Sequence, residues 1–140
     1  MPTVDFYLLE NPSSDAVNLT TCKLCEKAYE QQKTVFIYSK TKQDAENLDK
    51  LLWTYNDISF IPHALIPAKT PILIGFSGSP PPANYDILIN LTSESPSFFN
   101  QFNRVIEVVS GDAAEKQVAR EKYRFYRDNQ CELKSHQLQK

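Results

Sequence analysis

The chain has 140 residues, a length that suits a single domain, with 41% hydrophobic and 23% charged residues. Its formal net charge of −2 at pH 7 gives it no overall attraction for nucleic acid or for an acidic membrane, so any basic site must be local. No stretch approaches the roughly 20 apolar residues of a membrane span, and residues 1–5 lack the basic and apolar segments of a signal peptide.

Strand and helix patterns alternate along the first part of the chain. Residues 4–9 are a short apolar run ahead of an Asn-Pro pair, which predicts a buried strand. Residues 13–15 are N-cap candidates for a helix over residues 15–32, where apolar positions recur at helical spacing. Residues 34–38 are rich in β-branched and aromatic side chains, which predicts a second strand. A capping threonine then begins a second predicted helix over residues 41–53.

The middle of the chain mixes an irregular segment with further apolar runs. Residues 56–70 contain two prolines and are expected to be irregular. Apolar runs predict a third strand over residues 71–76, a fourth over residues 86–91 and a fifth over residues 104–109. A short helix is predicted over about residues 96–101, between the fourth and fifth strands.

The last predicted element is a helix that Asp112 can cap and that ends near Asn129. Residues 131–140 are polar and are expected to form a frayed C-terminal tail after a single domain over residues 1–130. Continuous apolar strands separated by helices favour a largely parallel sheet that is covered on both faces. With right-handed crossovers, the predicted fold is α/β: a single doubly wound, Rossmann-like sheet.

A doubly wound sheet invites a search for nucleotide-binding motifs, and this sequence lacks them. It contains only three glycines, and neither a G-x-G-x-x-G sequence nor a P-loop sequence is present. Both motifs need glycine because the backbone N–H groups must approach the phosphates closely. The sequence therefore predicts a Rossmann-like fold without nucleotide-binding motifs and with no cofactor.

Cys22 and Cys25 form a C-x-x-C pair, which is a partial signal for a metal or redox site. A structural zinc site needs four ligands, and only Cys131, His63 and His136 remain, at unrelated spacings. A thioredoxin-like pair would begin a helix after a strand, whereas this pair lies within a predicted helix. Ordinary helical cysteines and no metal site are expected, and reduced thiols make a cytoplasmic location the simplest inference.

The last predicted helix carries what we call the basic stripe. At about 100° per residue, four cations and one aromatic ring fall within an arc of roughly 100°: Lys116, Arg120, Tyr123, Arg124 and Arg127. Ala114, Val118 and Phe125 fall on the opposite side, which is the predicted core face. The stripe suits an acidic peptide with an apolar end, because the cations attract carboxylates and the ring supplies packing area. A solvated basic face and a weak site for a nucleic-acid backbone are the alternatives.

A second candidate surface surrounds the only tryptophan. Trp53 ends a predicted helix whose core positions are already filled, and Phe60 lies beside Pro62 in the irregular segment. Aromatic residues in such places can anchor a protein–protein interface, or they can fill the core beneath the loop. His63 could act as a general base, but no nucleophile motif accompanies it. A structural or interface role is therefore expected for His63, and no catalytic residues are predicted.

Several short motifs resemble the chi subunit family of DNA polymerase III, and they occur in order along nearly the whole chain. They are FYLL at residues 6–9, LLW at 51–53, FIPH at 60–63, YDILINL at 85–91 and AREKYRFYR at 119–127. The last motif matches the family's A-R-E-(R/K)-Y-(K/R)-x-Y-R run, in which lysine is frequent at the position of Arg124. Each motif alone is weak, but together they are fairly specific.

The resemblance implies a non-catalytic subunit of the DNA polymerase III clamp-loader complex that acts in DNA replication. Such a subunit forms a heterodimer with psi, which tethers it to the clamp loader, and it binds the acidic C-terminal tail of single-stranded DNA-binding protein. By position, the resemblance implies that the tail is bound by Lys116, Arg120, Tyr123 and Arg124. It also implies that psi, and a helicase that shares the same surface, contact Trp53, Phe60, Pro62 and His63. No direct contact with DNA is expected.

One departure from the family concerns the connection over residues 110–113, which is a few residues shorter than in familiar members. This shortening leaves open which residue forms the apolar wall of the tail pocket, and Val109 is one candidate.

Two other functions remain open from the residues alone. A small α/β enzyme with an unfamiliar site would show turnover or ligand-dependent stabilisation, and His63 would be the first residue to replace. A protein that binds single-stranded nucleic acid directly would be retained on DNA without a protein partner. The isoelectric point of about 5.7 argues against the second function, as does the lack of an aromatic platform among basic strands.

Overall fold

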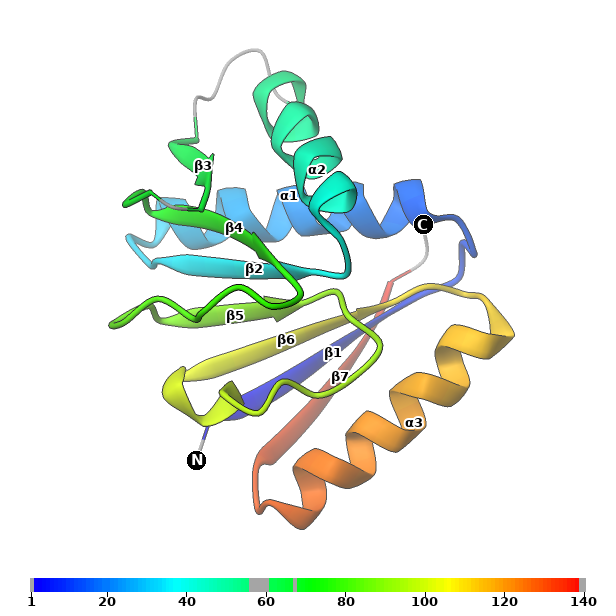
Figure 1. The fold of residues 1–140 in the computed structure, drawn as a ribbon. Helices are drawn as coiled ribbons and strands as arrows, with labels where there is room; N and C mark the ends of the chain where they lie inside the picture. Colours follow the sequence, from blue (N-terminus) through cyan, green and yellow to red (C-terminus); the bar gives the residue numbers. More distant parts are fainter. Residues whose placement is uncertain (1, 56–60, 67, 139–140) are drawn as a thin grey trace.

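A seven-stranded sheet forms the centre of the computed structural model, which describes residues 2–55, 61–66 and 68–138 (Figure 1). The strand order is β3-β4-β2-β5-β6-β1-β7, and every neighbouring pair is parallel. The strands are β1 (Thr3–Leu9), β2 (Val35–Ser39), β3 (His63–Leu65), β4 (Ile72–Phe76), β5 (Ile87–Asn90), β6 (Arg104–Val109) and β7 (Glu132–Leu138).

Helices cover both faces of the sheet, so the predicted doubly wound α/β class is confirmed (Figure 1). On one face lie α1 (Ser14–Glu30) and α2 (Lys42–Thr54), and on the other lies α3 (Ala113–Asp128). None of the helices formed by the described residues has the length and apolar character that crossing a bilayer would require.

Side-chain caps explain where the three helices begin. The Ser13 hydroxyl accepts the N–H of Ala16 at 3.2 Å, and the Thr41 hydroxyl accepts the N–H of Asp44 at 3.1 Å. The Asp112 carboxylate accepts the N–H of Glu115 at 3.2 Å. Each bond satisfies a backbone donor that has no partner within its helix, so the caps predicted from the sequence are confirmed.

The core consists of two apolar clusters, one on each face of the sheet. Successive strand residues point to opposite faces, so Ile37 packs under α1 and α2 while Phe36 packs under α3. Both of these side chains are fully buried. The near-continuous apolar runs in the sequence follow from this double coverage.

The predicted core face of the last helix is wrong. Ala119 and Tyr126 are the buried residues of α3, whereas Ala114 and Phe125 are exposed and Val118 is only half-buried. Helix residues seven apart lie one above the other, so these two set the inward direction. Tyr126 faces inward because its hydroxyl has a buried hydrogen-bond acceptor in Glu107. Phe125 instead packs edge-on against Phe99, with ring centroids 5.4 Å apart.

Two strands were missed by the sequence prediction. The stretch expected to be irregular over residues 56–70 contains β3, and the expectation of a frayed tail over residues 131–140 is wrong for β7. The sequence of β7 is mostly polar because it lies at the edge of the sheet, where side chains remain in contact with solvent. The short helix predicted near residues 96–101 is a single 3₁₀ turn, η1 (Phe99–Gln101).

A polar cluster holds β7 against β1. The buried carboxylate of Asp5 accepts hydrogen bonds from Arg104 Nε at 2.6 Å and from His136 Nε2 at 2.8 Å. The His136 ring stacks on Tyr7, with centroids 4.6 Å apart. Burial alone would raise the pKa of Asp5, but the hydrogen bonds and charges of His136 and Arg104 outweigh burial and hold the pKa below its usual value.

Replacing Asp5 by asparagine is expected to lower the free energy of unfolding at pH 7 by about 1 to 3 kcal/mol, because two donors lose a charged acceptor. A carboxyl whose folded-state pKa is depressed contributes stability above its unfolded pKa and loses it as pH falls through the folded value. The gap between the parent chain and Asp5→Asn should therefore close below about pH 4. Urea unfolding between pH 7 and pH 3 measures this gap.

The matched control for this prediction is Asp128→Asn. Asp128 forms an exposed ion pair with Arg127 at 3.3 Å, and such pairs contribute little. A gap for Asp5→Asn that stays constant down to pH 3 would contradict the assigned role of the carboxylate.

Candidate functional site

A hollow of about 350 Å³ lies between α3 and the ends of β1, β6 and β7. We call it the α3 groove. Its lining comes from the first three turns of α3, from β1 and β6 with the residues that follow them, and from two side chains of β7. The lining residues are Phe6, Leu8, Leu9, Glu10, Val109, Ser110, Lys116, Ala119, Arg120, Tyr123, Ser135 and Gln137.

The floor of the α3 groove is apolar. Phe6, Val109 and Ala119 are buried side chains that belong to the core cluster beneath α3, and Leu8 packs against them. The ring of Tyr123 leans on Phe6 with centroids 5.6 Å apart, while 40% of Tyr123 stays exposed. The floor can therefore receive an apolar side chain beside a partly exposed aromatic ring.

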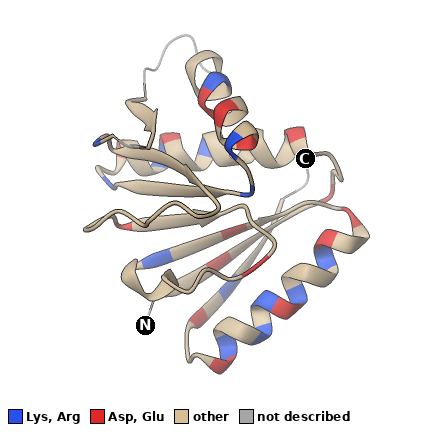
Figure 2. Cartoon of the chain, viewed as in Figure 1, with Lys and Arg blue, Asp and Glu red and all other residues tan. Residues whose placement is uncertain are grey.

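Three members of the basic stripe meet at this groove. Lys116, Arg120 and Tyr123 line it, and all three are exposed. Arg124 is also exposed but is not part of the lining, and Arg127 pairs with Asp128 near the end of the helix. Figure 2 shows that basic and acidic residues are interspersed along α3. Of the predicted stripe, Lys116, Arg120 and Tyr123 line this groove.

The charges at the α3 groove favour an anionic ligand. Two cations, Lys116 and Arg120, face one carboxylate, Glu10, among the lining residues. The Arg120 guanidinium donates one hydrogen bond to Gln117 at 3.2 Å, which leaves further donors for a ligand. Val109, the residue that the sequence left open as an apolar wall, is part of the lining.

Sequence analysis missed the contribution of β7, namely Ser135 and Gln137. Both lie in the segment that was expected to be a frayed tail. The signal that could have found them is a period of two, because Leu133, Ser135 and Gln137 alternate with charged and imidazole side chains.

The second candidate surface is built by the end of α2 and by β3. Trp53 is 56% exposed, and its ring lies 4.6 Å from that of His63. His63 is buried, and its ring nitrogens lie 2.7 Å from the carbonyl oxygen of Ile61 and 3.1 Å from that of Asp49.

The other residues predicted for this surface differ in their exposure to solvent. Pro62 is half-buried, and its carbonyl oxygen accepts the N–H of Ile72 at 3.3 Å. Phe60, which was predicted to belong to this surface, lies outside the described residues. Trp53 and Pro62 are therefore the accessible members of the described part, and the buried His63 packs against the tryptophan ring.

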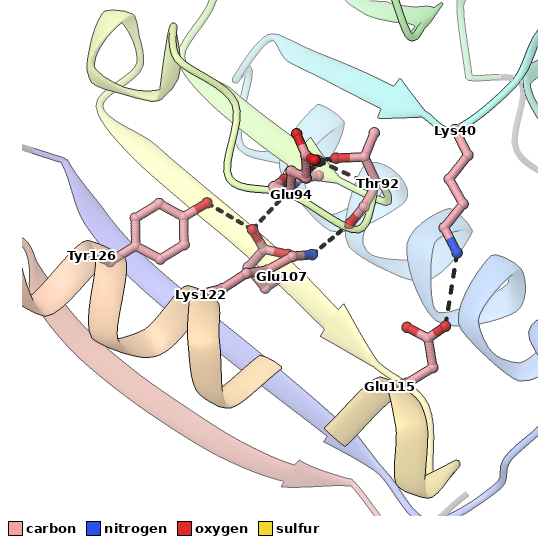
Figure 3. A network of polar contacts seen from close by, with 8 residues as sticks. Lys40, Thr92, Glu94, Glu107, Glu115, Lys122 and Tyr126 are labelled. Atoms are coloured by element: carbon pink, nitrogen blue, oxygen red, sulfur yellow. Dashed lines mark hydrogen bonds and ion pairs between the residues drawn. The ribbon is translucent and has the colours of Figure 1, made fainter. Parts of the chain in front are cut away.

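A buried polar network lies between α3 and the sheet (Figure 3). Glu107 Oε1 accepts a hydrogen bond from Lys122 Nζ at 2.9 Å, and Glu107 Oε2 accepts bonds from Asn90 at 2.8 Å and from the Tyr126 hydroxyl at 2.7 Å. Burial raises the pKa of Glu107, while Lys122, Asn90 and Tyr126 act in the opposite direction. Lys122, Asn90 and Tyr126 all donate to the same buried carboxylate, so the network ties α3 to β5 and β6.

Next to this network, a hollow of about 570 Å³ opens at the carboxyl ends of β2, β5 and β6, where open α/β sheets commonly bind ligands. Its lining includes four carboxylates, those of Asp15, Asp44, Asp112 and Glu115. Its two ammonium groups are already paired, Lys122 with Glu107 and Lys40 with Glu115 at 3.7 Å (Figure 3). This charge pattern disfavours a phosphate group.

The cysteine pair lies where the sequence predicted, inside α1. Cys22 and Cys25 are free thiols buried in the core beneath α1 and α2. Burial raises the pKa of Cys22 to about 12 and also raises the pKa of Cys25, so neither thiol forms a ready thiolate. Within the described residues, no group of three or more His, Cys, Asp or Glu could hold a metal ion.

The comparisons with known proteins point to one family. Residues 1–134 match the family model described as DNA polymerase III chi subunit, HolC. The chain belongs to the DNA polymerase III chi subunit family. This confirms the resemblance that its short motifs carry.

Full-length relatives of this family support the assignment. The chain is 39% identical to the DNA polymerase III subunit chi of Pseudomonas aeruginosa over 140 residues, which cover 99% of this chain and 98% of the relative. It is 33% identical to the Haemophilus influenzae subunit chi, covering 89% and 90% of the two chains. It is 30% identical to the Escherichia coli subunit chi, covering 91% and 92%.

Solved structures of DEAD-box proteins share the fold. A Saccharomyces cerevisiae Dbp5 variant bound to a Gle1 variant and IP6 superposes with a TM-score of 0.67 at 10% identity, over 96% of this chain. A DEAD box protein from Methanococcus jannaschii superposes with a TM-score of 0.60 at 14% identity, also over 96% of this chain. The chain spans 42% of each of those longer proteins, and the likeness concerns the fold alone.

Proposed function

We propose that the chain is a non-catalytic subunit of DNA polymerase III that links the clamp loader to single-stranded DNA-binding protein during DNA replication. It would join the clamp loader through the psi subunit and bind the acidic C-terminal tail of single-stranded DNA-binding protein. The observation that carries the proposal is the α3 groove, where Lys116 and Arg120 stand beside an apolar floor. Neither a cofactor nor a catalytic residue has a part in this function.

The chemistry of the α3 groove fits an acidic peptide with an aromatic end. Lys116 and Arg120 attract the carboxylates, and a guanidinium can hold a terminal carboxylate through two parallel hydrogen bonds. The apolar floor and the exposed part of Tyr123 offer packing area for the terminal ring. Arg124 lies outside the lining, so its contribution would be a longer-range attraction that salt screens.

The surface at the end of α2 is our candidate for psi, and for a helicase that would share it. Its support is an accessible tryptophan, Trp53, next to the half-buried Pro62. Exposed tryptophan is a common anchor of protein–protein interfaces. Phe60 and His63 belong to the same proposal, Phe60 by its position in the sequence and His63 through its contact with the tryptophan ring.

Tethering would be the mechanism. Several tails on one DNA-bound single-stranded DNA-binding protein raise the effective concentration of a partner whose single contact is weak. The chain would thereby hold the clamp loader at coated template and help to displace the primer-synthesising enzyme. The two candidate surfaces lie on different elements, α3 and α2 with β3, and this supports a subunit that would hold both partners at once.

Replacing Arg120 by alanine is expected to weaken the binding of an acidic, phenylalanine-terminated peptide at least about tenfold, because a charge-assisted hydrogen bond is lost. Fluorescence anisotropy with a labelled peptide measures the Kd. A peptide that lacks the terminal phenylalanine should also bind more weakly, because the floor loses its apolar occupant. Higher salt should weaken the binding without abolishing it.

Arg127→Ala is the matched control, because Arg127 carries the same charge on the same helix but lies outside the groove lining. Equal losses for Arg120→Ala and Arg127→Ala would mean that only the general charge of α3 matters. An absence of saturable binding at tens of micromolar peptide in low salt would rule out the proposed tail site. Retention of the chain alone on single-stranded DNA would favour direct nucleic-acid binding instead.

A further inference from the structure

The α3 groove has a border that the basic stripe does not supply. Ser135 and Gln137 of β7 line the groove, and both are exposed. In the pairing of β7 with β1, Ser135 is the partner of Phe6 and Gln137 is the partner of Leu8. The two polar side chains therefore lie directly beside the apolar floor, at the edge of the sheet. We call this pair the β7 border.

The side chains of the β7 border are available to a ligand. Among the described residues, neither Ser135 nor Gln137 has a side-chain hydrogen bond, an ion pair or a ring contact. A serine hydroxyl both donates and accepts, and a glutamine amide offers two donors and an acceptor. These are the groups that the N–H and C=O of a peptide main chain require.

The opposite face of β7 keeps the border in position. His136 lies between the two border residues, stacks on Tyr7 and binds the buried carboxylate of Asp5. These contacts fix the register of β7 on β1, since a shift by one residue would turn the border to the other face. The border is therefore placed by the fold and does not depend on a ligand to order it.

We propose that Ser135 and Gln137 bind the main chain of the peptide that occupies the α3 groove, and so select an extended peptide rather than any polyanion. This inference rests on the proposed function and deepens it. Lys116 and Arg120 on α3 would bind the carboxylates, and the floor would receive the apolar side chain. The β7 border, which carries no charge, would hold the peptide backbone along the sheet edge.

The salt dependence of the Kd distinguishes the contribution of the neutral β7 border from that of the charged residues of α3. Ionic strength screens the attraction between Arg120 and a carboxylate, whereas a hydrogen bond between neutral groups responds little. Loss of the border should therefore raise the Kd and leave its dependence on salt unchanged. Loss of Arg120 should raise the Kd and flatten that dependence.

The test is a Kd titration of the full chain with the acidic, phenylalanine-terminated peptide between low and moderate salt. The Ser135→Ala/Gln137→Ala variant is expected to bind about ten- to thirtyfold more weakly, with the salt dependence of the parent chain. The control is Ser97→Ala/Gln101→Ala, which removes the same two side-chain types at exposed positions outside the groove. Thermal unfolding of each variant checks that the border residues, which are exposed, leave the fold intact.

The outcomes separate this inference from the function on which it rests. If the parent chain binds the peptide and Arg120→Ala impairs binding, the tail site stands. Under those conditions, an unchanged Kd for Ser135→Ala/Gln137→Ala would overturn the role of the β7 border alone. A loss equal to that of the Ser97→Ala/Gln101→Ala control would overturn it as well. If the parent chain binds no peptide, both proposals fail together.

Discussion

Replacing Lys122 by methionine is expected to lower the free energy of unfolding at pH 7 by about 3 to 5 kcal/mol, because the buried Glu107 then loses its only cation among the described residues. Lys122 Nζ lies 2.9 Å from Glu107 Oε1, and the lysine side chain is only 11% exposed. Methionine keeps most of the packing volume, so the loss reports the charge. Urea unfolding measures the difference.

The destabilisation by Lys122→Met is expected to depend on pH. Burial raises the pKa of Glu107, and the charge of Lys122 is the first influence that opposes this rise. Without Lys122 the pKa rises further, so the variant is penalised most where Glu107 must be ionised. A carboxyl with a raised folded-state pKa loses its stabilising contribution as pH rises through that value. The gap between the parent chain and Lys122→Met should therefore shrink as pH falls from 7 towards 4.

Two further variants test the cause. Adding Glu107→Gln to Lys122→Met removes the buried carboxylate that has lost its cation and keeps a polar partner for Asn90 and Tyr126. The double variant should therefore recover a large part of the lost free energy of unfolding. Lys116→Met, on the exposed side of the same helix, should change stability by less than about 0.5 kcal/mol. A loss for Lys122→Met that is the same at pH 4 and pH 7 would point to packing rather than charge.

The glutamate network also explains why the sequence misplaced the inward face of α3. Helical periodicity and side-chain polarity alone place Ala114 and Phe125 on the inward face, because phenylalanine is more apolar than the neighbouring Tyr126. The structure buries Tyr126 and nearly buries Lys122, since both have a partner in Glu107. Glu107 lies on a strand, so the pattern of apolar residues along the helix carries no information about this partner.

In contrast, the sequence was sufficient to predict features that depend on interactions between residues close together in the chain. The helix starts at Ser13, Thr41 and Asp112 follow from side-chain caps that act within three residues. The charged wall of the α3 groove could be found because its members lie on one helix. The β7 border could not, because residues 132–138 become a strand only through their pairing with β1.

Replacing Gly111 by alanine is expected to lower the free energy of unfolding by more than about 3 kcal/mol, at the upper end of overpacking effects. A Cβ atom at this position would lie 1.9 Å from the carbonyl oxygen of Glu10 and 2.6 Å from its carbonyl carbon. The Gly111 N–H also donates to the carbonyl oxygen of Asn11 at 2.9 Å. The connection before α3 therefore packs directly on the backbone that follows β1, and neither side can yield by rotating a side chain.

This contact also connects the stability of the fold with the shape of the candidate site, because Glu10 and Ser110 both line the α3 groove. Any shift that relieves the clash in Gly111→Ala moves one side of the groove, so peptide affinity should fall together with stability. Gly78→Ala is the matched control: Gly78 has a φ of +94° and open space around its Cβ position. That variant should lose about 1 to 2 kcal/mol through backbone strain and keep the parent affinity. If Gly111→Ala were as stable and bound as tightly as Gly78→Ala, the close packing of the two connections would not describe the protein in solution.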